Sequence, residues 1–250
     1  MHHVLVIKGL CKRFGGIVVA DNIELQMKSG QILGLIGPNG AGKTSLFNLI
    51  TGNVRADEGA IRLNDVSLDG LAPYERARVG LSRTWQHIRL FPSLTVLDNL
   101  LVAPRSYPDE SPLSSLRTRT RADRRAVEER AYAQLEKVRM VDAAQRRPTE
   151  LSYGKQKLVS IARALMNDGN CLLLDEPMAG VEGPAYEAIK DVVRGEASAG
   201  RAICVVEHNI SFVRDLCDEA VFMFNGSIAA RGTVDDLIRT PALTELYFGS

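Results

Sequence analysis

Apolar residues near both ends of the chain run together or alternate over short stretches, which is the pattern of β-strands. Unbroken apolar runs at 31–36, 171–174 and 202–206 predict strands buried on both faces, as in a parallel sheet. Shorter stretches predict further strands at residues 4–8, 17–27, 61–63, 220–224 and 227–230. A turn is expected at 57–59, and Asn225 with Gly226 predicts a hairpin between the last two strands.

Helical patterns separate these strands. Residues 44–50 follow the first buried strand, and residues 186–196 lie between the later two. Helix formers also dominate 91–168, where a Pro- and Ser-rich loop at 104–112 interrupts them. The alternation of strands and helices in the last third predicts an α/β sheet with crossover helices.

The charge balance changes this picture little. The net charge is +1, so the surface as a whole does not indicate a nucleic-acid-binding protein. Residues 117–130 are rich in arginine, and a solvated helical face is the preferred interpretation. Contact with acidic lipid headgroups or a partner subunit is the alternative. Nucleic acid comes third, because the segment lacks interleaved aromatic residues.

Neither a membrane span nor a metal-binding cysteine pattern is indicated. No stretch approaches the roughly 20 apolar residues that a spanning helix needs, and residues 1–8 do not resemble a signal peptide. The four cysteines form no C-x-x-C pair. Cys171 and Cys204 fall in predicted buried strands, so we expect core thiols in a protein of a reducing compartment.

The segment between the first buried strand and the following helix matches the phosphate-loop pattern G-x-x-x-x-G-K-[ST]. It reads Gly37, Pro38, Asn39, Gly40, Ala41, Gly42, Lys43, Thr44. Glycines in such a loop let successive backbone N–H groups point into one concavity at a helix N-terminus. We expect Lys43 to reach the β- and γ-phosphates, Thr44 to offer its hydroxyl to Mg²⁺, and Asn39 and Ser45 to add phosphate contacts. The sequence therefore predicts a nucleoside triphosphate site.

Two carboxylates end the buried strand at 171–174. Asp175 suits the coordination shell of Mg²⁺, and Glu176 is placed to act as general base on the attacking water. Such a base contributes about 10²–10⁴-fold in rate. His208 follows another buried strand and Gln86 another short one, and the ends of parallel strands converge on a ligand crevice. His208 could contact the γ-phosphate or be structural, and Gln86 could touch the metal or the water.

The segment Leu151-Ser152-Tyr153-Gly154-Lys155-Gln156, followed by Ile161-Ala162-Arg163-Ala164-Leu165, resembles the signature of ABC transporter cassettes. That signature normally reads LSGGQ ahead of a helix and just upstream of the second carboxylate motif. The resemblance covers essentially the whole chain. Together with Gln86, Asp175, Glu176 and His208 in this order, it is far more specific than a phosphate loop alone.

The resemblance implies one P-loop NTPase (RecA-like) domain over 1–250, with a small antiparallel β region and an inserted helical subdomain. Residues 1–90 and 169–250 would form the nucleotide-binding core lobe, and 91–168 the helical signature lobe. Two cassettes, identical or different, would pair head to tail, so that Ser152 and the Gly154 N–H touch ATP held by the partner. Phe14 matches the aromatic residue that stacks on adenine, with a core phenylalanine as the competing interpretation.

Residues 77–91 and 94–103 are similar to the cassettes of branched-chain amino acid importers, where the segment after the glutamine docks on the membrane subunits. Urea or amide importers and the cassette that extracts lipopolysaccharide are near neighbours. A non-transport ABC ATPase is a further alternative, though such proteins usually carry two cassettes or a coiled-coil insertion. Three residues depart from the family pattern: Tyr153, Lys155 and Glu182.

The expected assembly follows from this subgroup. Transmembrane permease subunits and a second cassette would be direct partners, and a solute-binding protein an indirect one. No nucleic acid is expected. The chain would work at the cytoplasmic side of the inner membrane as a peripheral ATPase, with ATP and Mg²⁺ as cofactors.

Overall fold

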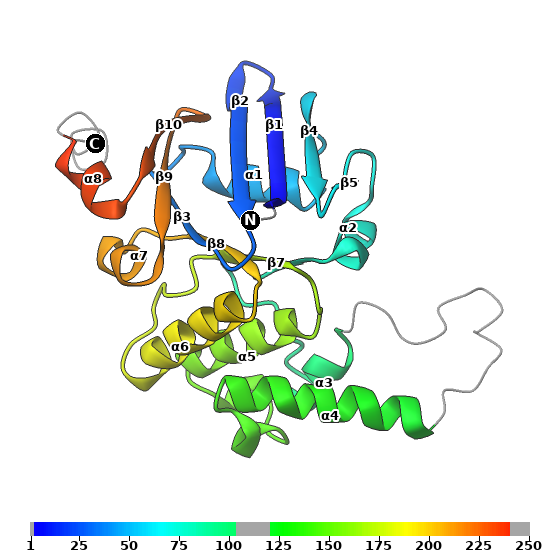
Figure 1. The fold of residues 1–250 in the computed structure, drawn as a ribbon. Helices are drawn as coiled ribbons and strands as arrows, with labels where there is room; N and C mark the ends of the chain where they lie inside the picture. The colour runs from blue at the N-terminus through cyan, green and yellow to red at the C-terminus, as the bar shows by residue number, and fades with distance from the viewer. Residues whose placement is uncertain (1–2, 104–120, 241–250) are drawn as a thin grey trace.

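The computed structural model describes residues 3–103 and 121–240 (Figure 1). The loop expected at 104–112, the first four residues of the arginine-rich segment and the C-terminal residues 241–250 lie outside the described residues.

A six-stranded sheet forms the centre of the protein, in the order β10-β9-β3-β8-β7-β6. Its strands are β3 (Ile32–Ile36), β6 (Leu81–Arg83), β7 (Cys171–Asp175), β8 (Ala202–Val206), β9 (Glu219–Phe224) and β10 (Ser227–Gly232). Five strands are parallel, and only β10 pairs antiparallel, with β9. The carboxyl ends of β6, β7 and β8 therefore lie along one edge, where their loops can meet.

A second, antiparallel sheet packs above the first, in the order β2-β1-β4-β5 (Figure 1). It consists of β1 (His3–Phe14), β2 (Ile17–Lys28), β4 (Glu58–Leu63) and β5 (Val66–Ser67). The turn expected at 57–59 is wrong, because Glu58 and Gly59 already belong to β4. The turn lies instead at Asn64 and Asp65, whose φ angles of 48° and 64° are left-handed. Asn and Asp tolerate this conformation better than most residues.

The helices cover both faces of the central sheet. They are α1 (Lys43–Ile50), α2 (Pro73–Val79), α3 (Val96–Leu101), α4 (Arg121–Lys137), α5 (Tyr153–Leu165), α6 (Pro184–Ser198), α7 (Ile210–Leu216) and α8 (Val234–Arg239), with 3-10 turns η2 (Val141–Ala143) and η3 (Pro148–Glu150). In Figure 1 α3, α4, α5 and α6 gather below the central sheet, whereas α1 lies between it and the second sheet. No helix in the described ranges is long and apolar enough to cross a membrane.

Successive side chains of β7 belong to two different hydrophobic cores. Leu172 and Leu174 pack in the core formed with α3, α4, α5 and α6. Cys171 and Leu173 pack in the core shared with α1 and the second sheet. All four side chains are fully buried, each leucine stabilising the fold by about 1.5–3 kcal/mol. The expectation of core thiols is confirmed for Cys171 and Cys204, and burial raises the pKa of Cys171 to about 12.

Helix α4 carries the described part of the arginine-rich segment. Arg125 pairs with Glu129 one turn later, and both side chains are mostly exposed. Exposed pairs of this kind contribute little stability. The described part of this segment thus fits a solvated helical face.

Candidate nucleotide-binding site

The phosphate loop turns sharply between β3 and α1, and two of its glycines cannot be replaced without moving the backbone. Gly37 has φ 149°, and a Cβ there would lie 2.1 Å from the carbonyl oxygen of Met223. Gly42, the N-cap of α1, has φ 103°, and its Cβ would lie 2.5 Å from the carbonyl oxygen of Val19. The loop is thus held against β2 and β9, with its backbone at a helix N-terminus where phosphate binds well.

Lys43 begins α1 and is 6% exposed. Its Nζ donates hydrogen bonds to the carbonyl oxygens of Gly37, at 2.7 Å, and Pro38, at 2.8 Å. Burial lowers the pKa of Lys43, and the nearby Glu176 and Asp175 carboxylates partly oppose that shift. The ammonium group therefore lies inside the phosphate loop and within the field of the two carboxylates.

Asp175 ends β7 and is 1% exposed. Its Oδ2 accepts a hydrogen bond at 2.7 Å from Nη2 of Arg83, whose side chain is 5% exposed. Its Oδ1 is buried with no hydrogen-bond partner. An unpartnered buried carboxylate oxygen is costly, and carboxylate oxygen is a ligand that Mg²⁺ prefers. Asp175 therefore fits the metal-binding role that the sequence suggests.

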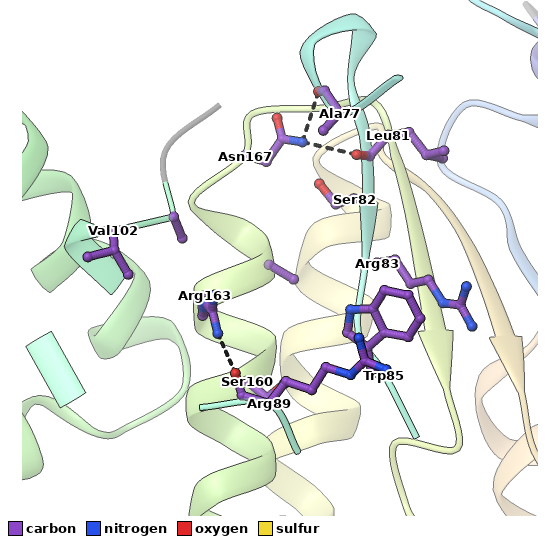
Figure 2. Close-up of a pocket in the computed structure, with 12 residues that line it drawn as sticks. Ala77, Leu81, Ser82, Arg83, Trp85, Arg89, Val102, Ser160, Arg163 and Asn167 are labelled. Atoms are coloured by element: carbon purple, nitrogen blue, oxygen red, sulfur yellow. Dashed lines mark hydrogen bonds between the residues drawn. The ribbon is translucent and has the colours of Figure 1, made fainter. Parts of the chain in front are cut away.

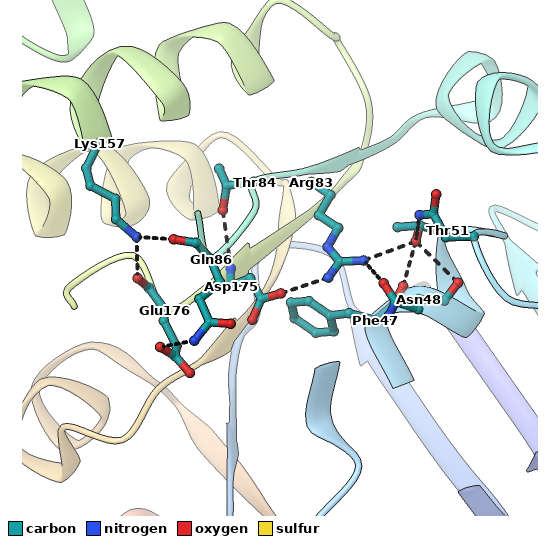
Figure 3. A network of polar contacts seen from close by, with 10 residues as sticks. Phe47, Asn48, Thr51, Arg83, Thr84, Gln86, Lys157, Asp175 and Glu176 are labelled. Atoms are coloured by element: carbon teal, nitrogen blue, oxygen red, sulfur yellow. Dashed lines mark hydrogen bonds and ion pairs between the residues drawn. The ribbon is translucent and has the colours of Figure 1, made fainter. Parts of the chain in front are cut away.

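Glu176 lies at the meeting point of three loops, and Figure 3 shows its contact with Gln86. Gln86 Nε2 donates to its Oε2 at 2.9 Å, and His208 Nε2 lies 3.2 Å from its Oε1. Its own backbone is left-handed, with φ 46°, and its N–H donates to the carbonyl oxygen of Val206 at 2.9 Å. The loops after β6, β7 and β8 thus bring together Gln86, Glu176 and His208, which are far apart in sequence.

Besides Arg83, two buried charged residues of the site were missed by sequence reasoning. Lys157 of α5 donates from Nζ to the main-chain carbonyls of Glu176, at 2.8 Å, and Gln86, at 3.1 Å. Glu207 accepts a hydrogen bond from the Met178 N–H at 2.7 Å, and burial raises the pKa of its carboxyl group. Glu207 directly precedes His208, which was a signal available in the sequence. No such signal existed for Lys157, because the number of residues between Lys157 and Glu176 does not indicate that they are in contact.

Phe14, Ser152 and Gly154 lie outside this cluster. Phe14 is 49% exposed at the end of β1, with Lys12 Nζ 5.1 Å from its ring centre, so the interpretation as a core phenylalanine is wrong. Ser152 is the exposed N-cap of α5, and Gly154 lies in its first turn against Ala185. In Figure 1 α5 and α1 lie on opposite sides of the central sheet. Ser152 and Gly154 are thus separated from the phosphate loop of their own chain.

The departures from the family pattern are all on the surface. Tyr153 is 45% exposed, and Lys155 and Glu182 are exposed as well. The ring of Tyr153 covers the loop at Gly180, where an added Cβ would meet it at 3.2 Å. None of the three substitutions therefore disturbs a buried core.

A cavity of about 400 Å³ opens between the segment that follows β6 and helix α5 (Figure 2). Two guanidinium groups lie over the ring of Trp85, with Arg83 4.2 Å and Arg89 4.0 Å from its ring centre. Arg163 of α5 donates to the Arg89 carbonyl oxygen at 2.6 Å and closes another side. These three arginines, and no carboxylate, are among the described residues that line the cavity. This cavity, called the cationic groove below, is therefore partly apolar and positively charged.

The ABC transporter family model matches residues 20–179. LivG of Salmonella typhimurium, a high-affinity branched-chain amino acid transport ATP-binding protein, is 35% identical over 98% of both chains. BraF of Pseudomonas aeruginosa, which carries the same description, is 34% identical over 98% of both.

Solved structures agree with these relatives. An ATP-binding cassette of an ABC transporter in its ADP conformation matches with a TM-score of 0.87 and 32% identity over all of both chains. In this chain the phosphate loop comes first. The signature on α5 follows it, and the carboxylates at the end of β7 come after the signature. The chain belongs to the ABC transporter family, as one of its ATP-binding cassettes, and is an ATPase.

Proposed function

We propose that this chain is the ATP-hydrolysing subunit of an importer for branched-chain or other hydrophobic amino acids. The relatives named for branched-chain amino acid transport span nearly its full length and support the substrate class. The observation that carries the hydrolytic role is the position of Glu176, held between Gln86 and His208 and next to the buried Asp175.

In this proposal the phosphate loop holds ATP through the backbone of Asn39, Gly40, Ala41 and Gly42 and the side chains of Lys43, Thr44 and Ser45. Thr44, Gln86 and Asp175 hold Mg²⁺, which neutralises charge on the phosphates. No group of three or more His, Cys, Asp or Glu side chains in the described ranges could form a metal cage. Phosphate oxygens and water would therefore complete the shell.

In hydrolysis, water would attack the γ-phosphorus while the bond from that phosphorus to the ADP oxygen breaks, with Glu176 as the general base. Its carboxylate accepts a proton from the attacking water, while Gln86 orients the carboxylate through its amide N–H. His208 lies 3.2 Å from the same carboxylate and would contact the γ-phosphate. Phe14, exposed at the rim, would stack on adenine. Each of these side chains lies at the end of a strand or in the loop that follows it.

A second cassette would complete the site. Ser152 and Gly154 lie on the far side of the central sheet from their own phosphate loop and are available to a partner's nucleotide. Hydrogen bonds to a charged phosphate are worth about 1.5–3 kcal/mol each. Residues 1–90 and 169–250 act as the nucleotide-binding lobe and 91–168 as the signature lobe.

The cationic groove beside Trp85 would receive the transmembrane permease subunits. It lies directly after β6, in the segment whose sequence resembles the docking region of branched-chain amino acid importers. The chain would then sit at the cytoplasmic face of the inner membrane as a peripheral subunit, with the solute-binding protein reached through the permeases and nucleic acid playing no part.

The test combines ATP hydrolysis with transport. Glu176→Gln should bind ATP with near-native affinity, lose about 10²-fold or more in hydrolysis, and abolish uptake of labelled leucine when it replaces the native chain in cells. Glu136→Gln, the same change on the exposed face of α4, should leave both unchanged. Rapid hydrolysis by Glu176→Gln would refute the general-base role. Lost hydrolysis with unchanged leucine uptake and impaired urea uptake would refute the amino-acid assignment alone.

A further inference from the structure

Lys157 is a buried cation that binds main chain. It is 3% exposed on α5, four residues after Tyr153, whose ring centre lies 5.7 Å from its Nζ. Its two hydrogen bonds go to the carbonyl oxygens of Glu176 and Gln86 (Figure 3). One ammonium group therefore joins the signature helix to both loops that supply the carboxylate and its amide partner.

The contact to Glu176 falls on a residue whose backbone conformation is strained. Glu176 has φ 46°, a left-handed conformation that costs energy for a residue with a side chain. Its N–H is held by Val206 on one side, and its carbonyl oxygen by Lys157 on the other. The direction of the carboxylate follows from that backbone conformation. Lys157 thus fixes the peptide from which the carboxylate projects.

The charges around Lys157 favour a cation at this place. Burial lowers its pKa, and the carboxylates of Glu207, Glu176 and Asp175 oppose that shift. Burying an ammonium group is costly, and an apolar side chain of similar length would pack at lower cost. Hydrogen bonds from a charged donor are roughly twice as strong as neutral ones, which suits a role in holding two loops.

We propose that Lys157 is a positioning residue for ATP hydrolysis: it orients Glu176 and the Gln86 loop relative to the signature helix without touching the nucleotide. This inference rests on the proposed role of Glu176 as general base. A movement of α5 would be transmitted through Lys157 to the main chain of both loops, so the orientation of the helical lobe and the hydrolytic geometry would change together.

Steady-state hydrolysis of Mg-ATP by the full chain tests the proposal. Lys157→Met should lower kcat about 10- to 100-fold, a part of the roughly 10²–10⁴-fold that a general base supplies, while KM for ATP stays within about twofold. Lys157→Arg keeps the charged donor and should restore most of kcat. Lys157→Gln, a shorter and uncharged donor, should resemble the methionine variant and replaces it if that variant does not fold.

Lys190→Met is the matched control. Lys190 is also a buried lysine on a helix, 5.5 Å from the ring centre of a tyrosine four residues earlier, but its partners are the Glu187 and Asp215 carboxylates away from the site. Its kcat should remain near native. If the Lys157 variants lose no more kcat than Lys190→Met, or lose ATP binding and kcat together, the proposal is wrong.

A double-mutant cycle with Glu176→Gln separates this inference from the proposed function. If Lys157 acts through Glu176, adding Lys157→Met to Glu176→Gln lowers the residual rate no further. Equal losses in both backgrounds would overturn the positioning role. Native hydrolysis by Glu176→Gln alone would instead refute the general-base assignment, whatever the rates of the Lys157 single variants.

Discussion

The buried pair of Arg83 and Asp175 gives a measurable prediction for stability. Arg83→Met keeps much of the side-chain volume but removes the guanidinium group that donates to Asp175 Oδ2 at 2.7 Å. Both side chains are at most 5% exposed, and Asp175 Oδ1 already has no partner. Removing one partner of a buried ion pair costs about 3–5 kcal/mol. For a chain of this size, that corresponds to a Tm lower by roughly 6–20 °C.

Arg89→Met is the control, because Arg89 also lies over the ring of Trp85 but is exposed. Cation–π contacts at exposed sites contribute about 0.5–1 kcal/mol, so Arg89→Met should change stability by no more than that. Urea unfolding measures the free energy of unfolding of both variants, provided that its slope with urea concentration, m, is the same in each. Mg-ATP should recover more stability in Arg83→Met than in the native chain, since Mg²⁺ then offsets an otherwise unpaired carboxylate. Equal losses in the two variants would refute this reasoning.

Two further predictions concern the phosphate loop and Glu207. Gly37→Ala should abolish ATP binding and lower Tm markedly, because the added Cβ would lie 2.1 Å from the carbonyl oxygen of Met223; a native Tm and affinity would show that the loop tolerates the shift. Burial raises the pKa of Glu207 above its ordinary value of 4.5, so its contribution to stability is greatest below that value and is lost as pH rises through the folded-state pKa. Glu207→Gln, which keeps an acceptor for the Met178 N–H, should therefore gain stability relative to the native chain as pH rises above 4.5. Parallel stability curves for the two proteins would contradict the assignment.

The sequence predicted the local structure best where one physical pattern dominates. The apolar runs of β3, β7 and β8 must be buried on both faces, and their positions agree with the structure within a residue. The phosphate loop was readable because glycine is the residue that its backbone angles and close contacts require. The turn at 57–59 failed because Asp57 is instead held by Lys12 and the Arg13 N–H beside β1, a long-range contact that local turn chemistry does not reveal.

The structure brings several of the predicted site residues together, but it also shows contacts that the sequence did not indicate. Gln86, Glu176 and His208 could be grouped from strand ends alone, since parallel strands converge at one edge. The pairing of Asp175 with Arg83, and the contacts of Lys157, depend on how α5 and β6 pack against β7. Sequence spacing does not determine such packing, so these contacts could only be found in three dimensions.

Because β7 contributes alternate side chains to two cores, neither core can open without uncovering one face of this strand. Its amide hydrogens, bonded to β6 and β8 on either side, should therefore belong to the slowest-exchanging part of the molecule, released only in global unfolding. Asp175 and Glu176 extend from that part, whereas α8 at the sheet margin packs in a small separate cluster. Local unfolding at the periphery would thus leave Asp175 and Glu176 in place. The edges of the molecule can open without changing the arrangement of these two carboxylates.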